Sequence, residues 1–263
     1  MADRMRDHFW LWGHPEGCYN HVWGNEKESR MTPFEGISYL GGRNTFMVPV
    51  GVPVNRRQYN KSFRPLNKVG WEIFNAGIDP DIVNQLVEES KEFKNITCGV
   101  FDDFACGRRY RQIPMENMYE VRRRLHENGP RPLDMWMVLY TRDYGRDPAL
   151  DEEFKPYLEP FDGIILWTWE EKDVVLFEEK YKLYKEMAKG KRTMLGLYLY
   201  NFGENKQCDP KVVAWELERY SELLRKGEVE GIVFHSNTMA DLDYPAYDVA
   251  VKWMEEHGDE VIG

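Results

Sequence analysis

Cysteine is scarce in this sequence and follows no ligand or disulfide pattern. The chain of 263 residues contains four cysteines, which are widely separated, at Cys18, Cys98, Cys106 and Cys208. No Cys-x-x-Cys pair occurs, and the spacings match no structural zinc site. We therefore predict free thiols, which argues against a small disulfide-stapled fold and against a zinc-ribbon domain.

Long apolar runs and a leader peptide are also missing. The longest apolar runs, such as Gly163 to Trp167, cover a few residues, whereas a membrane-spanning helix needs about 20. The first eight residues, MADRMRDH, contain no apolar signal-peptide core. We expect no membrane partner and a cytoplasmic protein, or a secreted or periplasmic one if a leader was removed ahead of this sequence.

Positive charge is in the minority. Lys and Arg number 35 against 45 Asp and Glu, so the net charge is −10 and the isoelectric point is about 5.2. Binding to a phosphate backbone draws on clustered Lys and Arg, so we expect no nucleic-acid partner. Gly-rich phosphate loops are missing as well, because segments 13–17 and 41–42 do not form G-x-G-x-x-G and no Walker sequence occurs.

What is present is an alternation of short apolar runs and amphipathic stretches. The composition, 42% hydrophobic and 30% charged, is that of a globular protein with a sizeable core. Seven runs are strand-length and rich in β-branched or aromatic residues. They are His8 to Gly13, Thr45 to Gly51, Ile96 to Phe101, Asp134 to Tyr140, Gly163 to Trp169, Thr193 to Tyr200 and Gly231 to His235.

Helix signals lie between these runs. Four starts combine an N-cap residue with proline at the first helical position, namely Thr32-Pro33, Asp79-Pro80, Asp147-Pro148 and Asp209-Pro210. Glu35 completes a capping box after Thr32. Apolar stripes at helical spacing predict helices over Asp79 to Lys94, Met115 to Leu125, Val174 to Met187, Val212 to Leu224 and Tyr247 to Met254.

Repeated strand and helix units predict a parallel sheet covered by helices. Since the dinucleotide-binding loop of an open sheet is missing, the pattern favours a closed barrel, and about 250 residues is the usual length of one. We therefore predict an α/β fold, a single (β/α)8 TIM-type barrel domain over residues 1–263. Seven strands are clear, so either the eighth is atypical or the barrel is incomplete.

Polar and aromatic residues gather directly after the apolar runs, which are the carboxyl ends of the predicted strands. Ligands of strand–helix barrels bind at those ends. Asp102 and Asp103 follow one run, and adjacent carboxylates there cost desolvation and mutual repulsion. Glu170 and Glu204 follow two other runs. These four are the candidate catalytic residues; the alternatives are that Asp103 caps the next helix and that Glu170 is a first-turn helix acid.

Other side chains at the strand ends are suited to binding sugars. Indole and phenol rings offer flat apolar faces, and neutral polar groups bond to hydroxyls, although some of the aromatic residues pack inside the barrel in the alternative interpretation. Arg108, in the basic loop 106–111, suits an anionic substrate. The candidates are Trp12, His14, Arg108, Tyr140, Trp167, Trp169, Tyr200, Asn201, His235 and Asn237. We also expect the long connections His14 to Met31 and Val52 to Ile78 to form walls of the site, with 51–57 overhanging it.

Two segments carry a resemblance to a known group of enzymes. The chain resembles glycoside hydrolases built on (β/α)8 barrels in Gly99-Val100-Phe101-Asp102-Asp103-Phe104 and in the segment Asp162 to Trp169. No particular family is identified. The resemblance implies a carbohydrate-active site with Asp or Glu catalysts, carried onto Asp102, Asp103 and Glu170.

The main functional prediction is a glycoside hydrolase that cleaves a glycosidic bond with two carboxylates and needs no cofactor. The predicted substrate is a carbohydrate, and anionic carbohydrates are among the candidates. One alternative is a metal-dependent sugar isomerase or epimerase with ligands from His14, Glu16, Asp103, Glu170 and His235. The other is a barrel that binds carbohydrate without catalysis.

Overall fold

The computed structural model describes residues 2–262, and its centre is a closed barrel of eight parallel strands. Neighbouring strands pair in the order β1-β10-β7-β6-β5-β4-β3-β2, and β2 closes the ring against β1. The barrel strands are β1 (Phe9–Gly13), β2 (Asn44–Met47), β3 (Lys68–Glu72), β4 (Ile96–Phe101), β5 (Asp134–Tyr140), β6 (Gly163–Trp167), β7 (Arg192–Tyr198) and β10 (Gly231–His235). The predicted TIM-type barrel is confirmed, with eight strands instead of seven.

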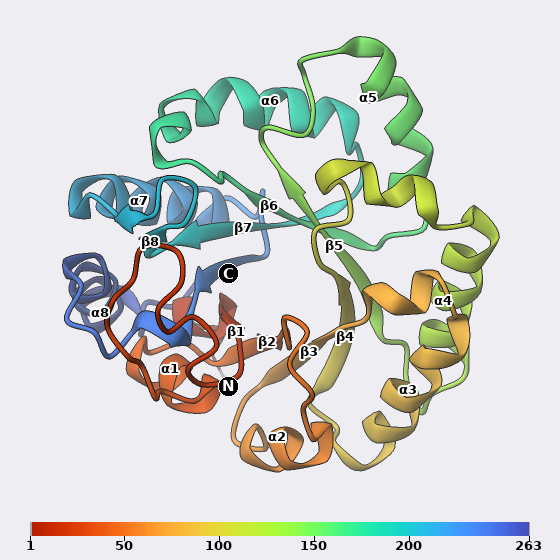
Figure 1. Cartoon of the computed structure of the whole chain (residues 1–263), viewed down its shortest axis with the longest axis horizontal. Helices are drawn as coiled ribbons and strands as arrows, with labels where there is room; N and C mark the ends of the chain where they lie inside the picture. Colours follow the sequence, from red (N-terminus) through yellow and green to blue (C-terminus); the bar gives the residue numbers. More distant parts are fainter. Residues whose placement is uncertain (1, 263) are drawn as a thin grey trace.

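The helices form a ring outside the strands, as the view along the barrel shows (Figure 1). They are α1 (Pro33–Tyr39), α2 (Arg56–Ser62), α3 (Val83–Glu92), α4 (Met115–Glu127), α5 (Pro148–Phe154), α6 (Phe177–Met187), α7 (Pro210–Arg225) and α8 (Pro245–His257). The capping box of Thr32 and Glu35 is present at α1, and Asp147 and Asp209 cap α5 and α7 with their side chains. Asp79 instead caps a short 3-10 turn, Pro80–Ile82, that precedes α3.

The prediction missed β3. The segment from Val52 to Ile78 was predicted to be one long connection, and this prediction was wrong because the segment contains both α2 and β3. The sequence of β3, KVGWE, has a charged residue at each end and glycine in the middle, so it lacks the apolar run of the other strands. Gly70 is required by packing: a Cβ there would lie 2.4 Å from a ring carbon of Phe46 on β2. The Phe46 ring therefore fills the space of an apolar side chain at position 70, and without that side chain the sequence of β3 does not read as a strand.

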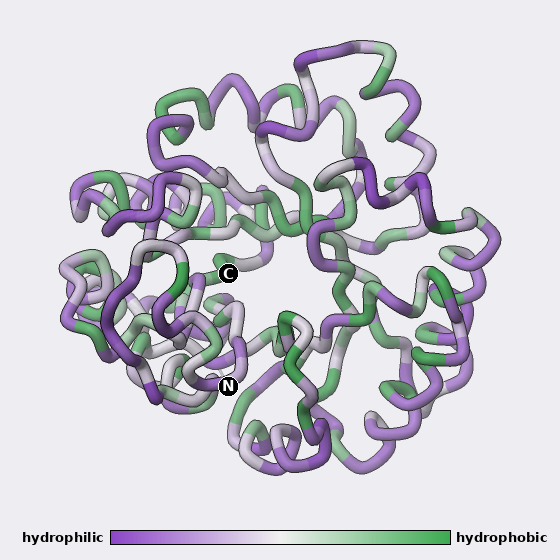
Figure 2. The backbone as a smooth tube through the Cα atoms, in the orientation of Figure 1, coloured by the Kyte–Doolittle hydropathy of each residue, from purple (hydrophilic) through white to green (hydrophobic). Residues whose placement is uncertain are grey.

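Two further pairs of an aromatic residue and a glycine on neighbouring strands pack the interior of the barrel. Trp136 of β5 lies over Gly163 of β6, where a Cβ would come within 2.3 Å of the indole. Trp167 of β6 lies over Gly196 of β7, where a Cβ would come within 1.9 Å. Hydrophobic residues accordingly concentrate along the central strands and hydrophilic ones along the outer helices and loops (Figure 2). Large aromatic side chains thus pack the interior of the barrel because glycine leaves them room.

The two ends of the described chain meet at the amino-terminal face of the barrel. The backbone of Met5 donates to Glu260, and that of Ile262 donates to Asp3. Arg4 and Arg6 both form ion pairs with Asp259. Within residues 2–262, no helix has the length and apolar character needed to span a bilayer.

Candidate active site

A cavity of about 410 Å³ opens at the carboxyl ends of the strands. Its volume is in the range of small-molecule sites. The residues that line it come from six strand ends and from the loops that follow β1, β2 and β4. They are Trp12, His14, Tyr19, Trp23, Val50, Asp102, Asp103, Cys106, Tyr140, Arg142, Trp167, Trp169, Tyr198 and His235.

Asp102 and Asp103, directly after β4, both line the cavity but have different surroundings. The pKa of Asp102 is raised well above its ordinary value by burial, and the negative charges of Asp103 and Glu72 raise it further. Asp103 has a left-handed backbone conformation, with φ of 51°. Its carboxylate accepts a hydrogen bond of 2.8 Å from the Tyr140 hydroxyl and lies 3.9 Å from the Arg109 guanidinium. Burial therefore favours the protonated form of Asp102, whereas Asp103 faces a hydroxyl donor and a guanidinium.

Two histidines on the opposite side of the barrel are neutral at pH 7. Burial lowers the pKa of His14 to about 4, and burial together with His14 lowers that of His235 well below its ordinary value. His14 Nδ1 lies 2.8 Å from the Val48 carbonyl oxygen, which can only accept, so Nδ1 carries the proton. His235 Nε2, 3.3 Å from His14 Nε2, is then the donor of that pair. Both rings serve as uncharged hydrogen-bonding groups in the wall.

Aromatic rings form most of the remaining wall. Trp12 meets Trp167 edge to face at 5.7 Å between ring centroids, and Trp167 lies 4.8 Å from Tyr198. Trp169 stands at nearly right angles to Tyr140, with centroids 5.8 Å apart. Trp12 and Trp167 are almost completely buried. These indoles therefore both fill the top of the barrel and border the cavity, so the two interpretations of them as packing and as binding residues are compatible.

The loop after β1 provides a further side of the cavity. Tyr19 contacts His14 through its hydroxyl at 3.1 Å, and Trp23, which is 42% exposed, stands edge-on to Trp169 with ring centroids 6.1 Å apart. In Figure 1 this red segment extends toward the hairpin of β8 (Tyr200–Asn201) and β9 (Lys206–Gln207). The Tyr200 hydroxyl donates to the Trp23 carbonyl at 2.8 Å and fastens the loop there. Val50, next to the segment expected to overhang the pocket, lines it too.

Glu170 and Glu204, the other two candidate acids, do not line this cavity. Glu170 forms an ion pair with Lys172. Glu204 accepts from the Asn201 amide at 2.6 Å and lies 3.4 Å from Lys206. The Asn201 amide lowers the pKa of Glu204 below its ordinary value. Both acids are thus engaged by other side chains outside the cavity that Asp102 and Asp103 share.

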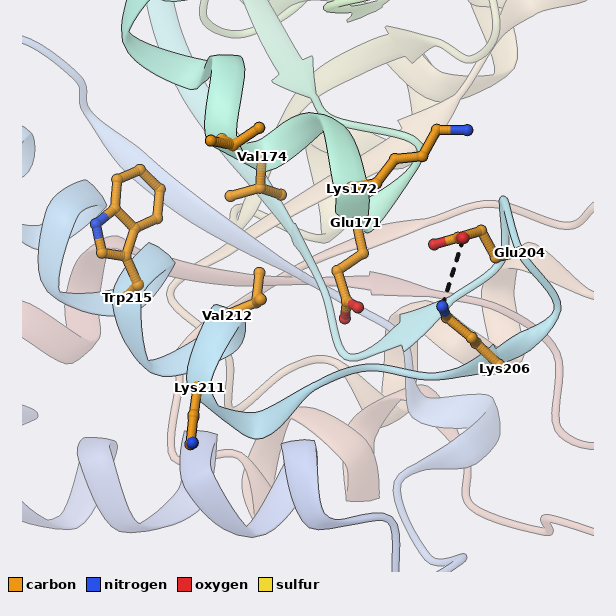
Figure 3. Close-up of a pocket in the computed structure, with 9 residues that line it drawn as sticks. Glu171, Lys172, Val174, Glu204, Lys206, Lys211, Val212 and Trp215 are labelled. Carbon is orange, nitrogen blue, oxygen red and sulfur yellow. Dashed lines mark ion pairs between the residues drawn. The ribbon is translucent and has the colours of Figure 1, made fainter.

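Glu204 instead borders a second hollow, of about 590 Å³, outside the barrel mouth. Figure 3 shows it between the segment after β6, the hairpin and the start of α7, with the Glu204–Lys206 pair at one end and Trp215 at the other. Val174 and Val212 lie between them. Two carboxyl groups line this groove, and both have partners: Glu171 accepts from the Asp209 backbone N–H at 2.6 Å, and Glu204 is paired with Lys206.

The remaining predicted binding residues support the cavity without lining it. Asn237 is buried, and its amide donates to the carbonyls of His14 and Met31 while its oxygen accepts from the His14 backbone. Tyr200 and Asn201 hold the Trp23 loop and Glu204, as described above. Arg108 is exposed, in the left-handed conformation with φ of 60°. Asn237, Tyr200 and Asn201 therefore position neighbouring segments, Arg108 lies outside the lining, and Arg142 provides the cation that the cavity presents.

Arg142, Tyr19, Trp23 and Tyr198 line the cavity but were not among the predicted site residues. Arg142 lies two residues past Tyr140, and Tyr198 is the last residue of β7, so the rule that sites lie at strand ends was a usable signal for both. Tyr19 and Trp23 lie in the segment 14–32 between β1 and α1, which has no regular strand or helix, so no periodicity indicates which side chains turn inward.

The five residues considered as metal ligands do not converge. Glu170 is paired with Lys172, and Glu16 accepts from the Tyr59 hydroxyl at 3.0 Å outside the cavity. Across residues 2–262, no group of three or more His, Cys, Asp and Glu side chains is arranged to hold a metal ion. The isomerase alternative therefore lacks the ligand set on which it was based.

Comparison with known proteins places the fold. No protein-family model and no curated protein sequence matches the chain. Among solved structures, the catalytic domain of a hyperthermophilic chitinase from Pyrococcus furiosus is similar, with a TM-score of 0.62, 11% identity and 98% of each chain covered. A family GH18 chitinase from Cycas revoluta in complex with allosamidin gives 0.59 and 10%, over 93% of this chain and 99% of that one.

The fold is shared with other activities too. A mutant tryptophan synthase α-subunit from Pyrococcus furiosus gives a TM-score of 0.53 at 13% identity, over 97% of this chain and 98% of that one. The chain therefore has the barrel fold found in glycoside hydrolases, as its sequence resemblance predicted, and no particular family is assigned. Because one barrel supports unrelated chemistries, its function has to be argued from the site.

Proposed function

We propose that this protein hydrolyses a glycosidic bond, with Asp102 as the general acid and Asp103 as the carboxylate partner. The observation that carries the proposal is the unequal pair at the tip of β4. Asp102 retains its proton because of burial and neighbouring negative charge, while Asp103 is held by Tyr140 and Arg109. Two carboxyl groups that differ in this way supply the acid and the base that glycoside hydrolysis requires.

The proton transfers follow from these environments. As the bond between the anomeric carbon and the leaving oxygen breaks, the Asp102 carboxyl donates its proton to that oxygen. The Asp103 carboxylate stabilises the positive charge that develops on the sugar ring and accepts a proton from the attacking water. The Tyr140 hydroxyl, 2.8 Å from Asp103, fixes the orientation of that carboxylate. The neutral histidines His14 and His235 can hydrogen-bond sugar hydroxyls without adding charge.

The aromatic wall supports a sugar as the substrate. Trp23 and Trp169 border the open side of the cavity and offer apolar ring faces to the C–H groups of a pyranose. Chitinases are among the proteins of similar fold, and one of them is described with allosamidin bound. Chito-oligosaccharides are therefore the first substrates to assay, followed by other neutral and acidic oligosaccharides.

The test is a hydrolysis assay of a panel of oligosaccharides with wild-type protein and three variants. Asp102→Asn and Asp103→Asn should each lower kcat about 10²- to 10⁴-fold, the usual range for loss of a general acid or base. Glu170→Gln is the matched control, because it removes a carboxylate from another strand end that does not line the cavity. It should retain activity within about twofold.

Calorimetric binding separates a catalytic barrel from a merely sugar-binding one. Asp102→Asn should keep the affinity for a substrate that it no longer cleaves, since the change is isosteric. Binding by the wild type with no hydrolysis of any bound oligosaccharide would contradict the proposal and favour a non-catalytic carbohydrate-binding barrel. Equal loss of activity in Glu170→Gln would contradict the assignment of the acid pair.

A further inference from the structure

Arg142 occupies a defined place in the cavity wall, and no other Lys or Arg of the described residues lines the cavity. It follows β5, and its guanidinium lies over two aromatic rings, 5.1 Å from the Tyr140 centroid and 5.0 Å from the Trp169 centroid. Both rings also line the cavity. Cation–π contacts to two rings restrict where the planar group can lie, so the guanidinium is pre-positioned before any ligand binds.

This guanidinium has no anionic partner in the part of the chain that the structure describes. No carboxylate of residues 2–262 lies within 4.0 Å of Arg142, and it donates no hydrogen bond to an oxygen atom there, unlike Arg109, which lies 3.9 Å from Asp103. Asp103 and Asp143 have other hydrogen-bond donors, although the charge of Arg142 counteracts the rise that burial causes in the pKa of Asp143. Asp103 accepts from the Tyr140 hydroxyl, and Asp143 accepts from the Tyr140 backbone N–H at 3.1 Å. Arg142 hydrogen-bonds the Cys106 thiol, and its other N–H groups remain available to a ligand.

The charge balance of the cavity points the same way. Among the described residues that line it, Arg142 is the one permanent cation. The two histidines are neutral at pH 7, burial raises the pKa of Asp102, and the Asp103 carboxyl lies 3.9 Å from the Arg109 guanidinium. A guanidinium that forms no ion pair among residues 2–262 and lines a partly buried cavity favours an anionic ligand group.

From this geometry we infer that Arg142 binds the carboxylate of an acidic sugar, so that the substrate class is a uronic acid glycoside. The inference rests on the proposed glycosidase function and specifies its substrate. A guanidinium matches a carboxylate with two parallel N–H···O bonds, which a neutral hydroxymethyl group at the same position cannot accept as strongly. The sugar would lie between the acid pair at the end of β4 and Arg142 at the end of β5.

Matched pairs of ligands test the inference without depending on turnover. Binding to the Asp102→Asn protein is measured by calorimetry for disaccharides that end in glucuronic or galacturonic acid and for their neutral glucose and galactose counterparts. One uronide should bind about 10- to 100-fold more tightly than its neutral counterpart, as expected for a charge-assisted bidentate contact. Its affinity should fall as NaCl is raised from 50 to 500 mM, whereas that of the neutral sugar should not.

Variants of two arginines on the same loop locate the effect. Arg142→Gln, made in the Asp102→Asn protein, should abolish the preference for the uronide, while Arg142→Lys should keep part of it because the charge remains. Arg146→Gln is the matched control, since it removes an equal charge from an exposed residue four positions away that does not line the cavity. It should change the affinity by less than about twofold, and circular dichroism confirms that each variant is folded.

The outcomes separate this inference from the proposed function. Equal binding of uronide and neutral sugar, or a preference that survives in Arg142→Gln, would overturn the role of Arg142 and leave hydrolysis of a neutral glycoside intact. A preference for sulfated over carboxylated sugars would overturn the uronic acid assignment. Failure of every oligosaccharide to bind or react would refute the glycosidase proposal itself.

Discussion

At the scale of single residues, Glu72 raises the pKa of Asp102 although it does not line the cavity. It lies at the end of β3, outside the lining, and its charge is one of the causes that raise the pKa of Asp102. Glu72→Gln removes that charge while the side-chain oxygen can still accept from the Phe74 backbone N–H. The pKa of Asp102 should fall, so the alkaline limb of the kcat/KM profile should move to lower pH by about 0.5–1 unit.

The Glu72 measurement is a pH profile of kcat/KM against the best substrate found in the panel. Glu72→Asp keeps the charge and is expected to leave the alkaline limb close to that of the wild type. An unchanged profile in Glu72→Gln would show that Asp102 is not the group that must be protonated.

Glu216, on α7, is a buried carboxyl group with no ion-pair partner among residues 2–262, and it makes stability depend on pH. Burial raises its pKa to about 8, although the Tyr220 hydroxyl donates to it at 2.9 Å. Between about pH 4.5 and 8 the folded protein retains a proton that the unfolded chain releases. The free energy of unfolding should therefore fall as pH rises through this window, by up to about 1.4 kcal/mol per unit from this group.

Glu216→Gln should remove that contribution and stabilise the protein relative to wild type at pH 8 more than at pH 5. Urea unfolding at pH 5, 6.5 and 8 measures the difference between the two proteins, so the opposing effect of the buried histidines cancels. Glu255→Gln, an exposed change on α8, is the control and should show no such pH-dependent difference. A wild-type minus Glu216→Gln difference that is constant with pH would contradict the argument.

The predictability of individual site residues depended on whether they sit at the end of a recognisable strand. Asp102 and Asp103 follow an apolar run, and the desolvation cost of two adjacent acids was a signal in the sequence. Arg142 was available from the same rule, but nothing in the sequence showed that Tyr140 and Trp169 would hold it without a carboxylate partner. That property arises only when side chains from two strands are brought together.

At the scale of elements, glycine and aromatic residues on neighbouring strands form pairs that pack the interior of the barrel, and one of these aromatic residues, Trp167, also lines the cavity. This pairing explains why β3 was missed, since Gly70 gives its strand no apolar run while Phe46 of β2 fills the space. The other seven strands were predictable because each consists mainly of apolar residues that the barrel and helices bury on both faces. The starts of α1, α5 and α7 were predictable from local caps, which need no tertiary contact.

Gly196→Ala tests the link between this packing and the site. A Cβ at position 196 would lie 1.9 Å from the Trp167 indole, so either the ring or β7 has to move. The change should lower the free energy of unfolding by about 1–3 kcal/mol and should also weaken substrate binding, because Trp167 lines the cavity.

Gly163→Ala is the matched control for Gly196→Ala. It crowds Trp136 in a similar way, with a Cβ 2.3 Å from the ring, but Trp136 does not line the cavity. Urea unfolding and calorimetric binding, measured on both variants, should show similar destabilisation and a loss of affinity in Gly196→Ala alone. Equal affinity in both variants would show that the position of Trp167 does not control the site.

At the scale of the whole molecule, the two faces of the barrel have separate tasks. The acid pair, Arg142 and the aromatic wall all lie at the carboxyl ends of the strands, in the usual division of this fold. At the opposite face, Arg4 and Arg6 pair with Asp259, Arg225 pairs with Glu260, and the backbones of the two chain ends bond to each other. These contacts join the segment before β1 to the segment after α8, at the face opposite the cavity, so they can contribute to stability without touching the chemistry.

Shortening the chain to end at Gly258 tests this separation. It removes Asp259, Glu260 and the backbone bonds from Met5 and Ile262, so the melting temperature should fall by several degrees, at about 2–4 °C per kcal/mol for a protein of this size. Arg225→Gln removes one of the ion pairs and should lower it by far less, since partly exposed pairs are worth about 0–1 kcal/mol. Circular dichroism at 20 °C is used to verify that the shortened protein is folded. Under those conditions its kcat/KM should equal that of the full chain. A loss of activity in the folded, shortened protein would mean that strain at the amino-terminal face reaches the acid pair through the strands.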